Sequence, residues 1–157
     1  MKKLIVCLLA LCTVITAQSA SFLDGVKVSP YAALEHPGFG APQWGAGVDV
    51  GFELNKYVTL SADLMSLEQN SWGGSTIDRA SLLATSSLFS SANKSFTIYG
   101  IGGGGFNFNT DNALFTVGLG VKYAFSKHVE VFADSRVYSE FKGDVGESSR
   151  MGLSYKF

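Results

Sequence analysis

Apolar residues recur at every second position in one stretch of this sequence after another. Between Trp44 and Leu54 every even position is apolar and every odd position is Gly or acidic. The same alternation returns at 58–64, 115–125, 129–140 and 150–157. Successive side chains of a β-strand point to opposite faces, so each run is predicted to be a strand with one apolar face and one polar or very small face. The pattern predicts an all-β protein.

Turn-forming residues divide the chain into eight runs, most of them long enough to cross a bilayer as tilted strands. The predicted strands are 26–34, 43–54, 57–68, 79–90, 95–106, 113–125, 128–141 and 148–157. Very short connections at 55–56, 91–94 and 126–127 alternate with longer ones at 35–42, 69–78, 107–112 and 142–147. Short turns at one end and longer loops at the other are typical of transmembrane barrels. We therefore predict an eight-stranded antiparallel up-and-down transmembrane β-barrel.

A soluble lipocalin-like barrel or a sandwich, with its apolar face inward, is the competing interpretation. Charged residues make up 16% of the chain, against roughly 25% in soluble domains. The apolar faces end in aromatic residues, which form girdles at membrane interfaces. These residues are Trp44, Phe52, Tyr123, Phe125, Tyr155 and Phe157. The other faces mix glycine with charges of both signs, which favours a narrow polar lumen over a solvated surface.

The N-terminus has the three parts of a secretory signal peptide. Lys2 and Lys3 precede an apolar stretch at 4–15, and small and polar residues follow at 16–20. An apolar stretch of this length is too short for a membrane-spanning helix, which needs about 20 residues. We predict cleavage after Ser19, with Ala20 as the alternative. The chain is then divided into a signal peptide at 1–19 and an outer-membrane barrel at 20–157.

Both cysteines, Cys7 and Cys12, lie within the predicted signal peptide. The rest of the chain therefore has no thiol for a disulfide or a thiolate metal site. Without Lys2 and Lys3, ten basic residues stand against 13 acidic ones. This mild acidity lacks the clustered Lys and Arg that nucleic-acid binding needs, so no nucleic-acid partner is expected.

Three stretches give the chain its resemblance to a known family. They are 47–54 running into 58–63, then 99–106, and 117–126. In their order and spacing the chain resembles the eight-stranded OmpA/OmpX and opacity-type outer-membrane barrels. The terminal Tyr155-Lys156-Phe157 is similar to the C-terminal aromatic signal that such proteins present to the barrel-assembly machinery. The loops are shorter than those of the adhesive members.

The resemblance implies a location in the cell outer membrane, in contact with outer-membrane lipid and lipopolysaccharide. It also implies periplasmic chaperones and the barrel-assembly machinery as partners during biogenesis, with Tyr155 and Phe157 as the assembly signal. A monomer is expected. The activities of the family are diverse, so the resemblance implies location and fold more than activity.

Gly100 to Gly105 have the glycine spacing of a dinucleotide-binding loop. Such a loop opens a helix and is followed by an acidic residue about 20 positions later. No helical pattern follows these glycines, so we interpret them as part of a strand that bends or makes room for bulky neighbours. No cofactor is expected.

The histidines, His36 and His128, lack a second His at ligand spacing, so no metal site is expected. Some small barrels modify lipid A with a His/Ser pair near the outer rim. The equivalent region here offers Ser139 and Glu140 but no His, the usual general base. We therefore predict a non-enzymatic barrel with an envelope role or a surface role through short outer loops. A lipid A-modifying enzyme that uses His36 or Ser139 and Glu140 is one alternative, and a small narrow pore is another.

The predicted inner face carries six acids and five bases. They are Lys27, Asp49, Glu53, Asp63, Lys122, Glu130, Asp134, Arg136, Glu140, Arg150 and Lys156. An eight-stranded barrel is only wide enough for side chains to fill, so these charges are predicted to form a network that plugs the lumen.

Counting back from the turns predicts which inner charges face each other. The predicted pairs are Lys122 with Glu130, Asp134 with Lys156, Glu140 with Arg150, and Asp49 with Asp63. Two carboxylates that face each other need a base between them, or one of them must hold a proton. Arg136 is predicted to be that base, because its guanidinium can serve two carboxylates.

Overall fold

The computed structural model describes residues 25–38, 40–67, 77–93, 95–141 and 145–157, so the predicted signal peptide lies outside the described residues. The described residues form eight strands near the predicted positions. They are β1 (Val26–His36), β2 (Gln43–Glu53), β3 (Val58–Leu67), β4 (Arg79–Ser90), β5 (Phe96–Asn107), β6 (Asn112–Ala124), β7 (Val129–Glu140) and β8 (Val145–Lys156).

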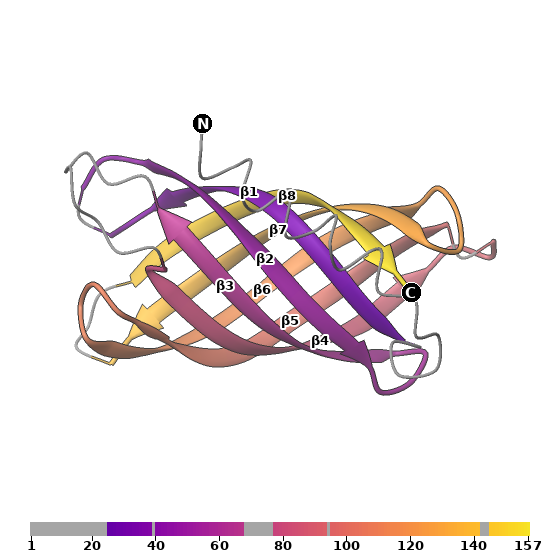
Figure 1. The fold of residues 1–157 in the computed structure, drawn as a ribbon, viewed down its shortest axis with the longest axis horizontal. Helices are drawn as coiled ribbons and strands as arrows, with labels where there is room; N and C mark the ends of the chain where they lie inside the picture. The colour runs from indigo at the N-terminus through magenta and orange to yellow at the C-terminus, as the bar shows by residue number, and fades with distance from the viewer. Residues whose placement is uncertain (1–24, 39, 68–76, 94, 142–144) are drawn as a thin grey trace.

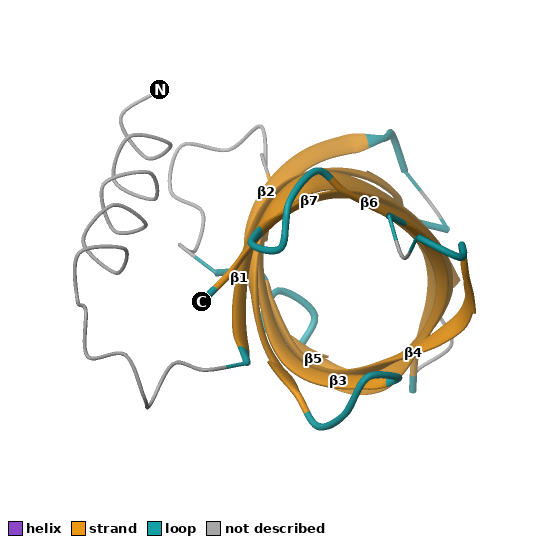
Figure 2. Ribbon diagram, turned by 90° about the vertical axis from the view of Figure 1, so that its right-hand side faces the viewer, coloured by secondary structure: helices purple, strands orange, loops and turns teal. Residues whose placement is uncertain are grey.

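The strands pair antiparallel in chain order, and β8 returns to pair with β1. Seen from one end the strands form a complete ring (Figure 2). The predicted eight-stranded up-and-down barrel is therefore confirmed. In the part of the chain described here, no helix is long and apolar enough to span a membrane.

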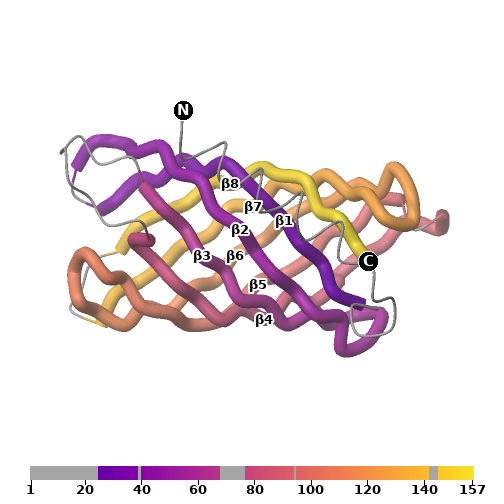
Figure 3. The backbone as a smooth tube through the Cα atoms, viewed as in Figure 1, coloured from indigo at the N-terminus to yellow at the C-terminus, as the bar shows by residue number. Residues whose placement is uncertain are grey.

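The three short turns and the C-terminus lie at one end of the barrel, at the right in Figures 1 and 3. We call this the turn end and the opposite end the loop end. At each turn a short polar side chain accepts backbone N–H groups, which is how such residues stabilise turns. Asn55 accepts from Tyr57 and Val58, Asn93 from Ser95, and Ser126 from His128 and Val129.

The outer surface of the barrel is apolar. Leu82 and Leu119 are 72% and 61% exposed, and both lie within their strands, away from the ends. Exposed aromatic residues mark both ends. At the turn end these are Phe52, Tyr57, Phe89, Phe96, Tyr123, Phe125 and Tyr155, and at the loop end Trp44, Phe106, Phe108, Phe115 and Phe141. An apolar band between two aromatic girdles matches the outer surface of a transmembrane barrel and not that of a soluble one.

The inner face holds most of the buried polar groups. Asp63, Asp134, Arg136, Arg150 and Lys27 are all less than 9% exposed. Aromatic residues such as Tyr31, Tyr99, Phe132 and Tyr138 are buried among them. This is the reverse of a soluble barrel, whose interior is apolar.

Asp49 lies opposite Asp63 in the β2–β3 ladder, as predicted. The predicted pairing of Lys122 with Glu130 is wrong, because Lys122 lies opposite Phe132. The two charged residues are therefore offset by two positions along β7. The offset arises because the β6–β7 turn is centred one residue later than expected.

The two predicted pairs of the last hairpin are also wrong. Asp134 lies opposite Arg150 and not Lys156, while Glu140 lies beyond the last β7–β8 pair, Ser139 with Val145. The loop is shorter than predicted because 145–147 belong to β8. The register is thereby shifted by an even number of residues, so every side chain keeps its predicted face.

One strand contains an irregularity that breaks the alternation. In the β4–β5 ladder Ser87 pairs with Tyr99 and Phe89 with Ile98, so Leu88 is an extra residue in a bulge. Leu88 and Phe89 are both exposed on the outside, and Ser90 then shares an inward hydrogen bond with Thr97. The bulge explains why polar residues occupy both Ser87 and Ser90.

Candidate functional site

The centre of the lumen is closed by a layer of two acids and two arginines. Arg136 and Arg150 each donate to Asp63 Oδ2, both at 2.9 Å, from their Nη1 atoms. Arg136 Nε donates to Asp134 Oδ1 at 3.0 Å, and Arg150 makes two bonds to Asp134, at 2.9 and 2.8 Å. Each guanidinium thus serves two carboxylates, which its planar fork permits. We call these four residues the central layer.

Two tyrosines complete the coordination of the central acids. The Tyr31 hydroxyl donates to Asp63 Oδ1 at 2.6 Å, and the Tyr99 hydroxyl donates to Asp134 Oδ2 at 3.1 Å. The Arg150 guanidinium lies 4.2 Å from the centre of the Tyr31 ring, within the range of a cation–π contact. The central layer is therefore both charge-balanced and extensively hydrogen-bonded, the condition under which buried ion pairs are tolerated.

Arg136 was predicted to bridge Asp49 and Asp63, and this prediction is wrong for Asp49. Arg136 joins Asp63 to Asp134, and Arg150 makes the same two connections. Asp49 lines the lumen beside this layer, but it forms no ion pair with a described residue within 4.0 Å. Arg150 was predicted to pair with Glu140, and its central role was missed because it depends on the β7–β8 register.

Toward the loop end lies a second buried ion pair that sequence reasoning missed. Arg79 donates to both carboxylate oxygens of Glu35, at 2.5 and 3.2 Å, and its guanidinium lies 4.0 Å from the centre of the Tyr138 ring. The turn signals predict Glu35 in the first outer loop, yet it belongs to β1 and is 2% exposed. Glu35 lies four residues after Tyr31, so continuing the alternation along β1 would have predicted that Glu35 points inward.

Glu140 accepts hydrogen bonds at the loop end and forms no ion pair with a base of the described residues. Its carboxylate accepts hydrogen bonds of 2.7–3.0 Å from the side chains of Asn107, Thr110 and Asn112. These bonds fasten the β5–β6 hairpin to the end of β7.

The same hairpin is also fastened to the start of β4. The Asn109 side chain donates to Asp78 Oδ1 at 2.7 Å, and the Phe108 amide donates to the Asp78 carbonyl at 2.9 Å. The other carboxylate oxygen of Asp78 accepts the Leu67 amide. Asp78 thus links the β5–β6 hairpin to the end of β3 and the start of β4, and the sequence pattern did not predict this role.

Toward the turn end the lumen contains a third, looser charge cluster. Lys27 Nζ lies 2.9 Å from Glu130 and 3.3 Å from Glu53, and Lys156 also pairs with Glu53. Lys122 Nζ is 3.9 Å from Glu130, although the two residues are not directly opposite. Each predicted inner charge therefore lies inside the barrel, but the partners of Asp134, Glu140, Arg150 and Lys156 differ from the predicted ones.

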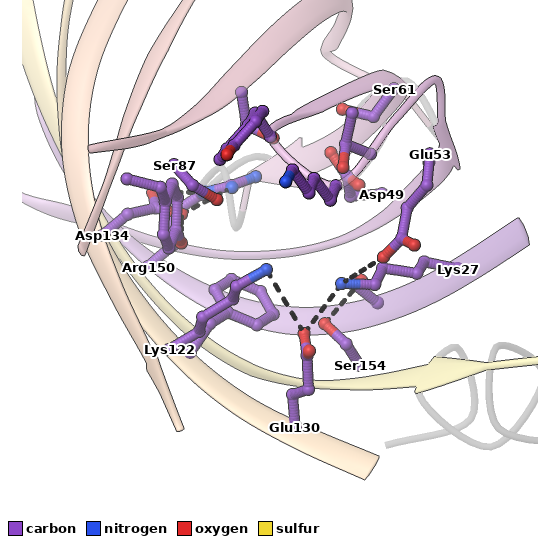
Figure 4. A pocket seen from close by; sticks show the side chains of 18 of the residues that line it. Lys27, Asp49, Glu53, Ser61, Ser87, Lys122, Glu130, Asp134, Arg150 and Ser154 are labelled. Carbon is purple, nitrogen blue, oxygen red and sulfur yellow. Dashed lines mark hydrogen bonds and ion pairs between the residues drawn. The ribbon is translucent and has the colours of Figure 1, made fainter. Parts of the chain in front are cut away.

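A cavity of about 110 Å³ occupies the turn-end half of the lumen, and we call it the vestibule. Its walls carry Lys27, Asp49, Lys122 and Glu130, and it extends from the Asn55–Tyr57 turn to the central arginines (Figure 4). A second cavity of about 20 Å³ lies beyond, beside Arg79. Arg136 and Arg150 line both cavities, so the central layer separates them.

The residues considered for catalysis do not come together. Ser139 is exposed on the outside of β7, whereas Glu140 points inward. His36 is the exposed last residue of β1 and not a loop residue as predicted. His128 Nδ1 lies 2.8 Å from the Lys156 carbonyl, and its ring stacks on Tyr155, which suits a structural role. No group of three or more His, Cys, Asp or Glu that could hold a metal ion occurs among the described residues.

Solved structures of similar shape come from several bacteria. Neisserial surface protein A superposes with a TM-score of 0.64 at 16% identity, covering 85% of this chain and 98% of that one. The N-terminal β-barrel domain of Pseudomonas aeruginosa OprF gives 0.59 at 17% identity, covering 84% and 98%. Ail of Yersinia pestis, solved with the heparin analogue sucrose octasulfate, gives 0.54 at 12% identity, covering 84% and 96%.

The fold is that of the small outer-membrane barrels. Comparisons with protein-family models and with curated proteins gave no match. At identities below 20% the solved small outer-membrane barrels establish the architecture, and the lumen of this chain has to be interpreted from its own residues.

Proposed function

We propose that this protein is a non-enzymatic outer-membrane barrel with a plugged lumen. Its role is to support the envelope or to present short outer loops to a surface partner. The central layer is the observation that carries the proposal, because its two arginines and two acids occupy the cross-section between the two cavities. The apolar band and its aromatic girdles support insertion into a membrane.

The closed lumen can be tested by recording currents from the purified chain in planar lipid bilayers. Folding is checked first by comparing boiled and unboiled samples in SDS, because a closed barrel resists detergent until its backbone hydrogen bonds are broken. We expect a mobility difference and no steady large single-channel current. A large steady current from the folded species would contradict the plugged lumen.

The absence of an enzymatic role is tested separately. The outward Ser139 and inward Glu140 argue against a shared catalytic site, and His36 lies at the end of a different strand. Cells that express the chain or its His36→Ala variant should have the same lipid A composition by mass spectrometry. A change with the original chain that the variant abolishes would favour the lipid A-modifying alternative.

The expected partners follow from location. The outer face would contact outer-membrane lipid and lipopolysaccharide, and Tyr155 and Phe157 would engage the assembly machinery after periplasmic chaperones deliver the chain. The outer face exposes many large apolar side chains, which suits contact with lipid, and we expect a monomer. Surface labelling of intact cells followed by cross-linking through the outer loops would identify a surface partner.

A further inference from the structure

The ladder that closes the barrel is interrupted. β1 and β8 pair at Val28 with Tyr155 and again at Tyr31 with Gly152. Ser29 and Pro30, which lie between, have no partner in the ladder to β8, although both are paired to β2. Among the described ladders the other irregularity is the Leu88 bulge, where pairing shifts register and continues. The seam between β1 and β8, which closes the barrel, therefore has a gap in its backbone pairing at these two residues, while the Pro30 carbonyl still lies against Gly152 of β8.

Proline causes this gap because it has no backbone N–H. The Phe157 amide donates to the Val26 carbonyl, so Val26 directs its backbone groups toward β8. Backbone direction repeats every second residue in a strand, so Pro30 also faces β8, opposite Leu153. The Leu153 carbonyl then lacks the donor that another residue at position 30 would supply.

The gap lies on the part of the wall that faces lipid. Pro30 is well inside β1, and the Leu153 side chain is 55% exposed on the outer surface. Hydrocarbon cannot supply a hydrogen bond to an unpaired backbone group, so a missing ladder bond weakens the wall more there than in water.

On the inner side, a side-chain contact spans the same gap. The Ser29 and Ser154 hydroxyls share a hydrogen bond of 2.8 Å, and both residues line the vestibule. Lys27 and Lys122 line the same cavity and both approach one carboxylate, that of Glu130 (Figure 4). A polar cavity that holds two ammonium groups and the carboxylates of Asp49, Glu53 and Glu130 is thus separated from lipid by a strand pair whose backbone bonds are incomplete.

We propose that the seam opens locally at Ser29–Pro30 and Leu153–Ser154 and admits the polar head group of a phospholipid into the vestibule. Its acyl chains remain outside, against the apolar surface of β1 and β8. The phosphate of the head group lies beside Lys27 and Lys122, in place of part of their contact with Glu53 and Glu130, and the ammonium group of a zwitterionic head group lies beside the carboxylates of the same cavity. This inference rests on the proposed membrane location but not on the absence of pore activity.

The test is thiol labelling from within the membrane. Cys7 and Cys12 are replaced by Ala, and a cysteine is introduced as Ser154→Cys at the seam or as Thr85→Cys on the β4 wall of the same vestibule. Each barrel is reconstituted in phosphatidylcholine vesicles that contain a phospholipid with a maleimide on its head group. A small water-soluble maleimide gives the intrinsic reactivity of each thiol.

We expect the lipid-borne reagent to label the seam cysteine faster than the β4 cysteine, after normalisation. Adding Pro30→Val supplies the missing donor and should slow seam labelling about fivefold, the factor for one hydrogen bond of about 1 kcal/mol. Equal labelling at both positions, or no effect of Pro30→Val in a folded barrel, would overturn the proposal. The mobility of the unboiled sample shows independently whether the barrel has folded. A variant that fails to fold can therefore be distinguished from a folded barrel whose seam stays closed.

Discussion

Asp63 on β3 accepts a hydrogen bond from Arg150 on β8 at 2.9 Å, although β3 and β8 are not neighbours in the barrel. The contact crosses the lumen. It joins the N-terminal and C-terminal halves of the barrel at the same carboxylate oxygen that Arg136 reaches from β7. The stability of the closed ring should therefore depend on these side chains as well as on the backbone ladder.

Replacing either central arginine should destabilise the barrel. Arg136→Ala leaves Asp63 and Asp134 with fewer partners, and breaking a buried pair costs about 3–5 kcal/mol. Arg150→Ala should cost more, because Arg150 makes three hydrogen bonds to these acids and Arg136 makes two. The urea midpoint of the gel mobility shift measures both. Asp63→Asn should partly restore the Arg136→Ala variant, and an additive double mutant would contradict the coupling.

The Arg79–Glu35 pair should contribute more than the ion pairs near the turn end. Arg79→Ala removes a two-bond contact to a carboxylate that is 2% exposed, so we expect a loss of about 3 kcal/mol. Lys122→Ala, the matched control, removes a partly exposed pair at 3.9 Å and should cost less than about 1 kcal/mol. Both are measured by urea unfolding in detergent micelles. Similar losses would show that burial does not distinguish the two pairs.

Two glycines should differ in their response to the same substitution. A side chain at Gly120 would collide with the Tyr99 ring and Asp134, whereas Gly102 has open space around its missing Cβ. Gly120→Val should therefore destabilise the barrel by about 1–3 kcal/mol through overpacking. Gly102→Val, on the outer face of β5, should be close to neutral. Equal unfolding midpoints for the two variants would mean that the lumen can rearrange around Gly120.

The C-terminal aromatic pair should matter for assembly. The Tyr155 and Phe157 rings are 5.0 Å apart, and the Phe157 amide donates to Val26 at the closing seam. Phe157→Ala keeps that backbone bond and removes the ring, so we expect much lower amounts of protein in the outer-membrane fraction. Phe141→Ala, which removes an 83% exposed ring at the loop end, is the control. Equal membrane levels would argue against an assembly signal at the C-terminus.

The face of each inner charge could be predicted from sequence, but most partners could not. Lys122, Asp134 and Arg150 all point inward because alternation depends only on odd and even positions. Partners depend on where each turn forms, and the last loop is shorter than its composition indicated. The meeting of Asp63 with Arg150 depends further on strand tilt and stagger around the whole ring, which no local pattern encodes.

The Leu88 bulge has a consequence for length variation in this chain. Deleting one residue from a regular barrel strand would turn the remainder inside out, moving charged side chains into lipid and apolar ones into the lumen. Leu88 has no partner on β5, so its removal would leave Ser87, Phe89 and Ser90 free to continue one regular alternation. Position 88 is therefore the place in the described β4 where a single-residue deletion could be accommodated with both faces preserved.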